Sequence, residues 1–182
     1  MGETIRLMQK KLFDVKKIFD IPVANITPKD TPQIIIDLMH QNNKSTILGV
    51  NPHNLNQVNT NKEFKKIMQS STLAYPEGIG TIWASHFLGK PLKKRTNLLD
   101  FMFPFLKIAE ENHMSLFLLG GTKEVNIKAF NFLKNKFPAL KLVGRNSGYF
   151  KDQDKIIDKI NKTHPDILFV ALGTPMQEIW IS

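Results

Sequence analysis

Cysteine is absent from this chain of 182 residues, and so is any long apolar segment. Without cysteine there are no disulfides and no thiolate chemistry, whatever the compartment. No apolar run approaches the roughly 20 residues that span a bilayer, and the charged N-terminus lacks the apolar core of a secretory signal. We therefore expect a cytoplasmic protein. The five histidines show no metal-ligand spacing, so we expect no metal site and no cofactor.

Acidic residues are scarce relative to basic ones. The chain has 25 Lys and Arg against 16 Asp and Glu, a net charge of +9. Such a surface attracts anions, among them nucleic acid, anionic lipid and phosphorylated small molecules. No Cys/His finger, RNA-binding aromatic signature or basic heptad is present, so the sequence predicts no nucleic-acid partner.

Short apolar runs alternate with amphipathic segments along the chain. This alternation predicts an α/β fold, a mainly parallel sheet with helices on both faces in a single domain over residues 21–182. The expected strands are 21–26, 46–51, 72–75, 115–121, 140–144 and 166–173. The expected helices start at Thr27, Pro52 (broken near 59–61), Ile79, Leu98 (interrupted near Pro104), Lys123, Asp152 and Pro175.

Residues 1–20 form a basic, partly amphipathic N-terminal segment. Three interpretations remain open for it: a helix covering part of the core, a membrane-surface helix, or an arm that binds a partner.

Glycines and polar side chains follow several of the expected strands. In open α/β sheets, ligands bind outside the carboxyl ends of the strands. The sequence therefore predicts that one edge of the sheet gathers a common set of segments: Asn51, Glu77, Gly120, Arg145 to Tyr149, and Gly173 to Gln177.

Four side chains, at Glu77, Arg95, Gln177 and Tyr149, each have two interpretations. Glu77 either performs chemistry at a strand end or complements the dipole at the start of a helix. Arg95 is either a solvated loop charge or a clamp on a phosphate. Gln177 is either an exposed first-turn residue or a donor to a sugar hydroxyl. Tyr149 is either part of the core or a flat face on which a base stacks.

The pair Gly78 and Gly80 matches the first two glycines of a dinucleotide fingerprint. Trp83 stands where the third glycine belongs, and close packing of helix on strand needs a small residue there. The sequence therefore argues against NAD binding.

The last expected helix starts at Pro175, and the sequence stops about one turn later at Ser182. A helix that short is not stable alone. We therefore expect the C-terminal part of the fold to be missing.

Taken together, several segments resemble the WecG/TagA/CpsF glycosyltransferases, glycosyltransferase family 26. The matching segments occur in the family's order from about Phe19 to the end of the chain. They are Gly49-Val50-Asn51-Pro52, Pro76-Glu77-Gly78-Ile79-Gly80, 89–95, 118–121, Gly148-Tyr149-Phe150, and 165–180 with its Pro-x-Gln-Glu-x-Trp ending.

The resemblance implies a Rossmann-like fold and an inverting, metal-independent transferase. The family moves N-acetylmannosamine or a related sugar from a UDP donor to a polyprenyl-diphosphate-linked acceptor. Its products feed wall teichoic acid, enterobacterial common antigen or capsule. The implied location is peripheral, at the inner face of the cell membrane, and self-association is an open possibility.

The resemblance also implies roles for single residues. Glu77 takes the position of the catalytic base, Asn51 and Gln177 hold sugar hydroxyls, Arg95 contacts phosphate, and Tyr149 lies near the uracil. The strand-end glycines Gly78, Gly120 and Gly173 complete the implied substrate-binding set.

This sequence departs from the family pattern in three places. Glu77 stands where Asp is usual, Gly49 stands where Thr is usual, and the family's C-terminal helices with their arginines are missing. One extra methylene moves a base by about 1 Å, and misplacement on that scale costs on the order of a hundredfold in rate. We therefore expect weak or no transfer from these 182 residues.

The departures also favour an alternative, a catalytically degenerate module that binds a nucleotide or a partner. A basic nucleic-acid binder of the same fold is the third hypothesis.

Overall fold

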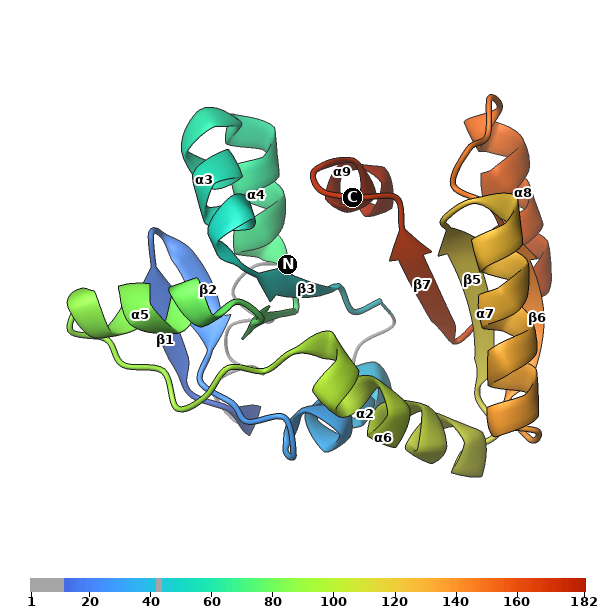
Figure 1. The fold of residues 1–182 in the computed structure, drawn as a ribbon, viewed down its shortest axis with the longest axis horizontal. Coiled ribbons are helices and arrows are strands. Elements are labelled where there is room, and N and C mark those ends of the chain that lie inside the picture. Colours follow the sequence, from blue (N-terminus) through green and yellow to red (C-terminus); the bar gives the residue numbers. More distant parts are fainter. Residues whose placement is uncertain (1–11, 42–43) are drawn as a thin grey trace. The chain divides into compact units, whose positions relative to one another are not determined.

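The computed structural model describes residues 12–41 and 44–182. The chain packs as two compact units. The first runs to Phe105 and includes Glu178–Trp180 and Ser182, and the second contains Leu106–Gln177 and Ile181. The predicted α/β class with parallel strands is confirmed, but the described strands fall into three separate sheets (Figure 1).

The first unit begins with an antiparallel hairpin. Strands β1 (Val15–Ile18) and β2 (Ile21–Ala24) pair with Ile18 opposite Ile21. The two turn residues, Phe19 and Asp20, have positive φ angles of 44° and 68°. Positive φ at both central residues is the signature of a type I′ turn, whose twist matches that of the flanking strands.

This hairpin corrects the prediction for the N-terminal segment. The end of the segment is strand β1, because pairing with β2 buries Ile18 completely and supplies its backbone hydrogen bonds. Lys17 and Lys65 each form an ion pair of 3.0 Å with Asp20 at the turn. The part of the prediction that falls on residues 1–11 lies outside the described residues.

The central sheet of the first unit is a parallel pair. Strands β3 (Ile47–Val50) and β4 (Leu73–Pro76) pair with Val50 opposite Pro76. Its helices are α2 (Thr31–Gln41), α3 (Pro52–Thr60), α4 (Lys62–Ser70), α5 (Ile79–Phe87) and α6 (Leu98–Glu111), which continues into the second unit. The largest fully buried side chains of this unit are Ile18, Ile21, Val23, Leu38, Val50, Phe64, Met68 and Leu73.

The predicted helix break near residues 59–61 is confirmed. Asn61 ends α3 as its C-cap and starts α4 as its N-cap, where its side chain accepts a hydrogen bond from the Phe64 N–H.

Two other helix predictions were wrong. Helix α2 starts at Thr31 instead of Thr27, because the Thr27 hydroxyl bonds to Asp30 at 2.7 Å and holds a turn ahead of the helix. Helix α6 continues through Pro104 without interruption. Burial of Phe101 and Phe105 on one face of α6 offsets the loss of one helical hydrogen bond, which costs about 3 kcal/mol.

The second unit is a three-stranded parallel sheet with the order β6-β5-β7. The strands are β5 (Ser115–Gly120), β6 (Lys141–Asn146) and β7 (Ile167–Ala171), and its helices are α7 (Lys123–Lys136) and α8 (Gln153–Thr163). Helix α9 (Met176–Ile181) follows β7 and has residues in both units. The crossovers from β5 to β6 and from β6 to β7 run in opposite directions. Right-handed crossovers therefore place α7 and α8 on opposite faces of the sheet. Every residue of the central strand β5 is buried.

A pair of side chains, which we call the latch, joins Ser115, the first residue of β5, to Asp166, the residue that precedes β7. Asp166 Oδ2 accepts hydrogen bonds from the Ser115 hydroxyl at 2.6 Å and from its N–H at 2.7 Å. The Asp166 N–H in turn donates to Ser115 Oγ at 2.9 Å. The hydrogen bond from the Ser115 side chain is the main reason why the pKa of Asp166 lies below its ordinary value.

Among residues 12–41 and 44–182, no helix has the length and apolar character needed to cross a bilayer.

We expect Ser115→Ala to lower the free energy of unfolding by about 1–2 kcal/mol near neutral pH, because it removes a hydrogen bond to a charged acceptor. The lowered pKa of Asp166 means that its contribution is present above its unfolded value of about 3.9 and is lost as the pH falls through the lower folded value. Urea unfolding of Ser115→Ala and wild type should therefore converge as the pH falls. The exposed serine variant Ser70→Ala is the control, and an equal loss in both variants would contradict the latch.

Candidate functional site

Parallel pairing places Asn51 beside Glu77. These are the residues that directly follow the opposed pair Val50 and Pro76 at the ends of β3 and β4. Asn51 Nδ2 donates a hydrogen bond of 3.1 Å to Glu77 Oε2. The two side chains that the sequence assigns to one edge therefore share a direct contact.

The carbonyl of Val50 anchors the turn that carries Glu77. It accepts from the Glu77 N–H at 3.0 Å, the Gly78 N–H at 3.2 Å and the Thr81 hydroxyl at 2.9 Å. Thr81 lies fully buried on the inner face of α5. Sequence reasoning missed Val50 and Thr81, since a backbone acceptor leaves no side-chain signal.

Asn51 also caps helix α3, and the cap fixes the direction of its amide. Asn51 Oδ1 accepts from the Asn54 N–H at 3.0 Å, and the Asn51 N–H donates to Asn54 Oδ1 at 3.2 Å. With its oxygen turned toward the helix, the amide presents its NH₂ group to the Glu77 carboxylate. The carboxylate is thus oriented by a side chain that is itself held by the backbone.

Gly49 provides the space in which the Glu77 carboxylate lies. A Cβ atom on Gly49 would lie 2.7 Å from Glu77 Oε2 and 3.1 Å from the Tyr75 hydroxyl oxygen. Gly49 pairs with Tyr75 across the sheet, so both side chains at 75 and 77 extend over the bare glycine. A side chain at position 49 would displace the carboxylate.

The Tyr75 hydroxyl is buried near the carboxylate. Burial raises the pKa of the Tyr75 phenol well above its ordinary value, and the charge of Glu77 raises it further. Tyr75 also packs edge-on against Phe101, with ring centroids 5.1 Å apart. The phenol is therefore a neutral, fixed wall of the site.

Gly78 is the N-cap of α5 and allows a close approach of the two turns. A Cβ atom on Gly78 would lie 2.7 Å from Pro52 Cδ and 3.0 Å from Asn51 Cβ. A larger residue would therefore push the Asn51 turn away from the Glu77 turn.

Arg95 lies in the loop between α5 and α6, and its side chain is exposed. The next residue, Thr96, is fully buried and donates its N–H to the Pro76 carbonyl at 2.7 Å. This bond ties the loop to the end of β4, directly before Glu77. The structure thus brings Asn51, Glu77 and Gly78 together and anchors the loop of Arg95 to the same strand end.

The remaining predicted residues belong to the second unit. Gly120 is the last residue of β5, and Gly173 lies two residues after the end of β7. Their φ angles are +129° and +84°, which favour glycine. A Cβ on Gly120 would collide with the Ala171 carbonyl, so this position requires glycine for space as well. The Gly121 N–H donates to the same carbonyl at 3.1 Å.

Tyr149 and Gln177 also lie beyond strand ends of this sheet. Tyr149 is 82% exposed, so the interpretation as a core residue is wrong. It follows Gly148, whose N–H donates to the Gly121 carbonyl at 2.8 Å. Gln177 Oε1 accepts from the Gly173 N–H at 3.2 Å, which closes the turn before α9.

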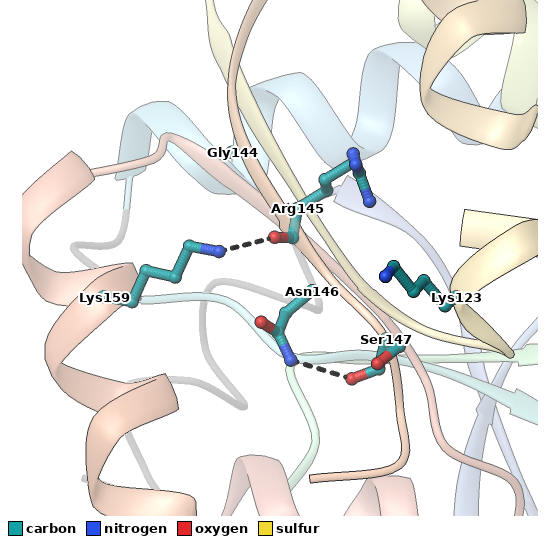
Figure 2. A pocket seen from close by; sticks show the side chains of 6 residues that line it. All are labelled: Lys123, Gly144, Arg145, Asn146, Ser147 and Lys159. Carbon is teal, nitrogen blue, oxygen red and sulfur yellow. Dashed lines mark hydrogen bonds between the residues drawn. The ribbon is translucent and has the colours of Figure 1, made fainter. Parts of the chain in front are cut away.

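A cavity of about 350 Å³ lies along the edge strand β6. Figure 2 shows its lining residues, which are Lys123, Gly144, Arg145, Asn146, Ser147 and Lys159. Three of the six are cations and none is a carboxylate, so the cavity suits an anion. Lys159 Nζ donates to the Arg145 carbonyl at 2.8 Å, which holds one cation against the strand.

Sequence reasoning singled out residues 145–149 but missed Lys123 and Lys159. Lys123 is the first residue of α7, after the Gly120-Gly121 turn, where helix N–H groups also favour anions. This position at the start of a predicted helix could have identified Lys123 as an anion contact from the sequence. Lys159 reaches the cavity from α8, and no spacing in the sequence predicts that contact.

Within the described ranges, no three His, Asp or Glu side chains lie close enough to share a metal ion.

Parallel strands whose carboxyl ends carry a carboxylate, an amide and tight glycine turns define a ligand-binding α/β protein. The family model described as "Glycosyl transferase WecG/TagA/CpsF family" matches residues 16–182. The chain belongs to this glycosyltransferase family, which confirms the resemblance seen in the sequence.

Curated relatives agree with this assignment. The chain is 33% identical over 143 residues to an N-acetylglucosaminyldiphosphoundecaprenol N-acetyl-beta-D-mannosaminyltransferase of Bacillus spizizenii, covering 79% of this chain and 56% of the relative. A protein of the same name from Staphylococcus aureus is 33% identical over 140 residues, covering 76% of this chain and 55% of the relative. The chain therefore spans about half the length of the curated relatives it matches.

We expect Gly49→Ala to destabilise the fold by about 1–3 kcal/mol, because the new methyl group overlaps the Glu77 carboxylate. The same substitution in a Glu77→Ala background should cost less by at least about 0.5 kcal/mol, since the overlapping oxygen is gone. Chemical unfolding of the four proteins in this cycle measures the difference. An equal penalty in both backgrounds would show that Glu77 does not occupy the space above Gly49.

We expect Tyr75 to resist ionisation. The chain has two tyrosines, so Tyr149→Phe leaves Tyr75 as the only phenol. Because the folded pKa of Tyr75 is raised, its contribution to stability is present below the unfolded value of about 10 and is lost as the pH rises through the folded value. Phenolate absorbance of the variant should thus appear only well above pH ~10, together with unfolding. Ionisation near 10 in the folded protein would contradict the buried position.

Proposed function

We propose that this chain is the core of an inverting glycosyltransferase. It would move N-acetylmannosamine or a related sugar from a UDP donor to a polyprenyl-diphosphate-linked acceptor, in the synthesis of bacterial surface polysaccharide or teichoic acid. The relatives' names support the sugar and the lipid-linked acceptor. The hydrogen bond between Asn51 and Glu77 at the strand ends is the observation that carries the proposal.

In this proposal Glu77 is the general base. Its carboxylate accepts the proton of the acceptor hydroxyl while the hydroxyl oxygen bonds to the anomeric carbon from the side opposite UDP. The bond from that carbon to the UDP oxygen breaks, and UDP leaves with the electron pair. A positioned base contributes about 10²–10⁴-fold to such a step.

The geometry around Glu77 suits this role. The hydrogen bond from Asn51 goes to Oε2, so the proposal assigns the incoming proton to Oε1. Gly49 leaves room for a side chain one methylene longer than the family's usual Asp. The Tyr75 hydroxyl forms part of the wall behind the carboxylate, and its raised pKa keeps it from competing as a second anion.

The proposal assigns donor binding to the other predicted residues. Arg95 would contact phosphate, Gln177 a sugar hydroxyl, and Tyr149 the uracil, with Gly78, Gly120 and Gly173 allowing close backbone approach. The exposure of Arg95 and Tyr149 supports roles toward a ligand. The cationic cavity beside Arg145 supports an anionic ligand in the second unit.

The lipid-linked acceptor implies a peripheral place at the inner face of the cell membrane. A net charge of +9 favours such a surface, because cytoplasmic leaflets carry anionic lipid.

A binding module without catalysis remains the second candidate. The observation that favours it is the identity of residue 77, since Glu replaces the family's usual Asp. UDP binding by calorimetry without UDP release in the presence of donor and acceptor, in a chain extended to the length of the curated relatives, would select this candidate.

In a chain extended to the length of the curated relatives, we expect Glu77→Gln to lower donor- and acceptor-dependent UDP release at least about a hundredfold, because the isosteric amide cannot take a proton. UDP affinity, measured by calorimetry, should change by less than about twofold, since the base does not bind the leaving group. Asn61→Asp, which alters a helix cap in the same unit, is the control. Release that persists unchanged in Glu77→Gln would remove Glu77 from the role of base, and absence of UDP binding would contradict both candidates.

A further inference from the structure

Helix α5, the light green helix in Figure 1, exposes several apolar side chains to solvent. Ile79, Trp83 and Phe87 are 48%, 62% and 94% exposed. They are spaced by four residues, so they form one stripe along the helix. Leu88, at the C-cap, extends the stripe and is 43% exposed.

The inner face of the same helix is polar. Its buried residues are Thr81 and Ser85. Thr81 donates to the Val50 carbonyl, and Ser85 Oγ accepts from the Leu92 N–H at 3.1 Å. A surface helix ordinarily turns its apolar side inward. Helix α5 is the reverse, and contiguous exposed apolar surface of this kind marks an interaction site.

Cations lie next to this stripe. Lys90, Lys93 and Lys94 follow the helix and are all exposed. Buried Leu92 and the 2.7 Å bond from the Lys93 N–H to Asn25 Oδ1 hold this loop against the first unit. No Asp or Glu occurs between Gly78 and Leu99. The helix and its loop therefore combine apolar surface with positive charge only.

We propose that Ile79, Trp83, Phe87 and Leu88, together with Lys90, Lys93 and Lys94, form a docking surface for an anionic lipid bilayer. We call this set the α5 surface. The apolar stripe would enter the boundary between headgroups and acyl chains, and the lysines would contact anionic headgroups. A tryptophan beside aliphatic and phenylalanine side chains is typical of segments at that boundary.

Charge decides between a bilayer and a second copy of the chain. In a symmetric dimer the same surface lies on both sides of the interface, so the lysines of both copies would gather there without a carboxylate from this segment to pair them. An anionic bilayer pairs all of them. The apolar and cationic parts are thus satisfied by the same partner.

This inference rests on the proposed lipid-linked acceptor and adds which surface of the first unit would face the membrane. Helix α5 starts two residues after Glu77, and its buried Thr81 shares the Val50 carbonyl with the Glu77 N–H. Docking through α5 would therefore hold the Glu77 turn close to the lipid headgroups, where a diphosphate on a polyprenyl chain is located.

The test is co-sedimentation of the full chain with vesicles of phosphatidylcholine alone or with added phosphatidylglycerol. We expect binding to the anionic vesicles only. Lys93→Gln/Lys94→Gln should lower the partition coefficient about fivefold per lysine, and Trp83→Ser/Phe87→Ser should lower it at least about tenfold. Matched controls on α7, Lys128→Gln/Lys134→Gln and Val125→Ser/Phe132→Ser, remove the same charge or exposed apolar side chains elsewhere and should bind like wild type.

Tryptophan fluorescence gives a second readout. A blue shift on anionic vesicles in wild type should disappear in Trp83→Phe, which keeps the surface apolar and leaves Trp180 in place. Residues 1–20 are present in every variant, so any contribution of that basic segment cancels.

Three results would overturn the inference. They are no binding to anionic vesicles, equal losses in the α5 and α7 variants, or self-association without lipid that Trp83→Ser/Phe87→Ser abolishes. Circular dichroism checks that each variant is folded. Vesicle binding requires no UDP-sugar, so failure here and failure of sugar transfer are independent results.

Discussion

The candidate site depends on the register of one parallel strand pair. Because Val50 lies opposite Pro76, the residues that follow them, Asn51 and Glu77, lie side by side. The Val50 carbonyl then fixes the Glu77 turn through three donors. A slip of one residue would turn each strand's side chains to the other face and separate the pair. Two strands of four residues therefore set the position of the carboxylate more than any single side-chain contact does.

Space is the second constraint on this site. The carboxylate of Glu77 lies over Gly49, so the residues at 49 and 77 are not independent. The resemblance to the family implies two departures at these positions, a longer acid and a smaller neighbour. The structure joins them, because the missing side chain at 49 makes room for the additional methylene at 77. A substitution at either position changes the geometry of the other, and close packing leaves little slack to absorb it.

The distribution of apolar residues along the sequence predicted strands and helices well where it clearly matched one type of element. The run 115–120 is buried at every residue, and its apolar continuity predicted a buried strand. Prediction failed where tertiary contacts overrode local preference, as in strand β1 and in the helix across Pro104. The positions of the strand ends predicted that Asn51 and Glu77 would lie together. Contacts made by backbone atoms, such as the Val50 carbonyl, and by long side chains from other helices, such as Lys159, have no sequence signature.

Helix α5 shows how the site constrains the surface. Its inner face is committed to polar contacts, since Thr81 binds the carbonyl that anchors the Glu77 turn and Ser85 holds the loop at Leu92. The two fully buried positions of α5 are therefore occupied by polar side chains. A soluble surface would replace the exposed apolar residues of α5 with polar residues at little cost, because exposed positions tolerate substitution. Their presence at Ile79, Trp83 and Phe87 is therefore a feature of the outer surface that packing inside the unit does not require, and the lysines beside them give that surface a charge as well as an apolar face.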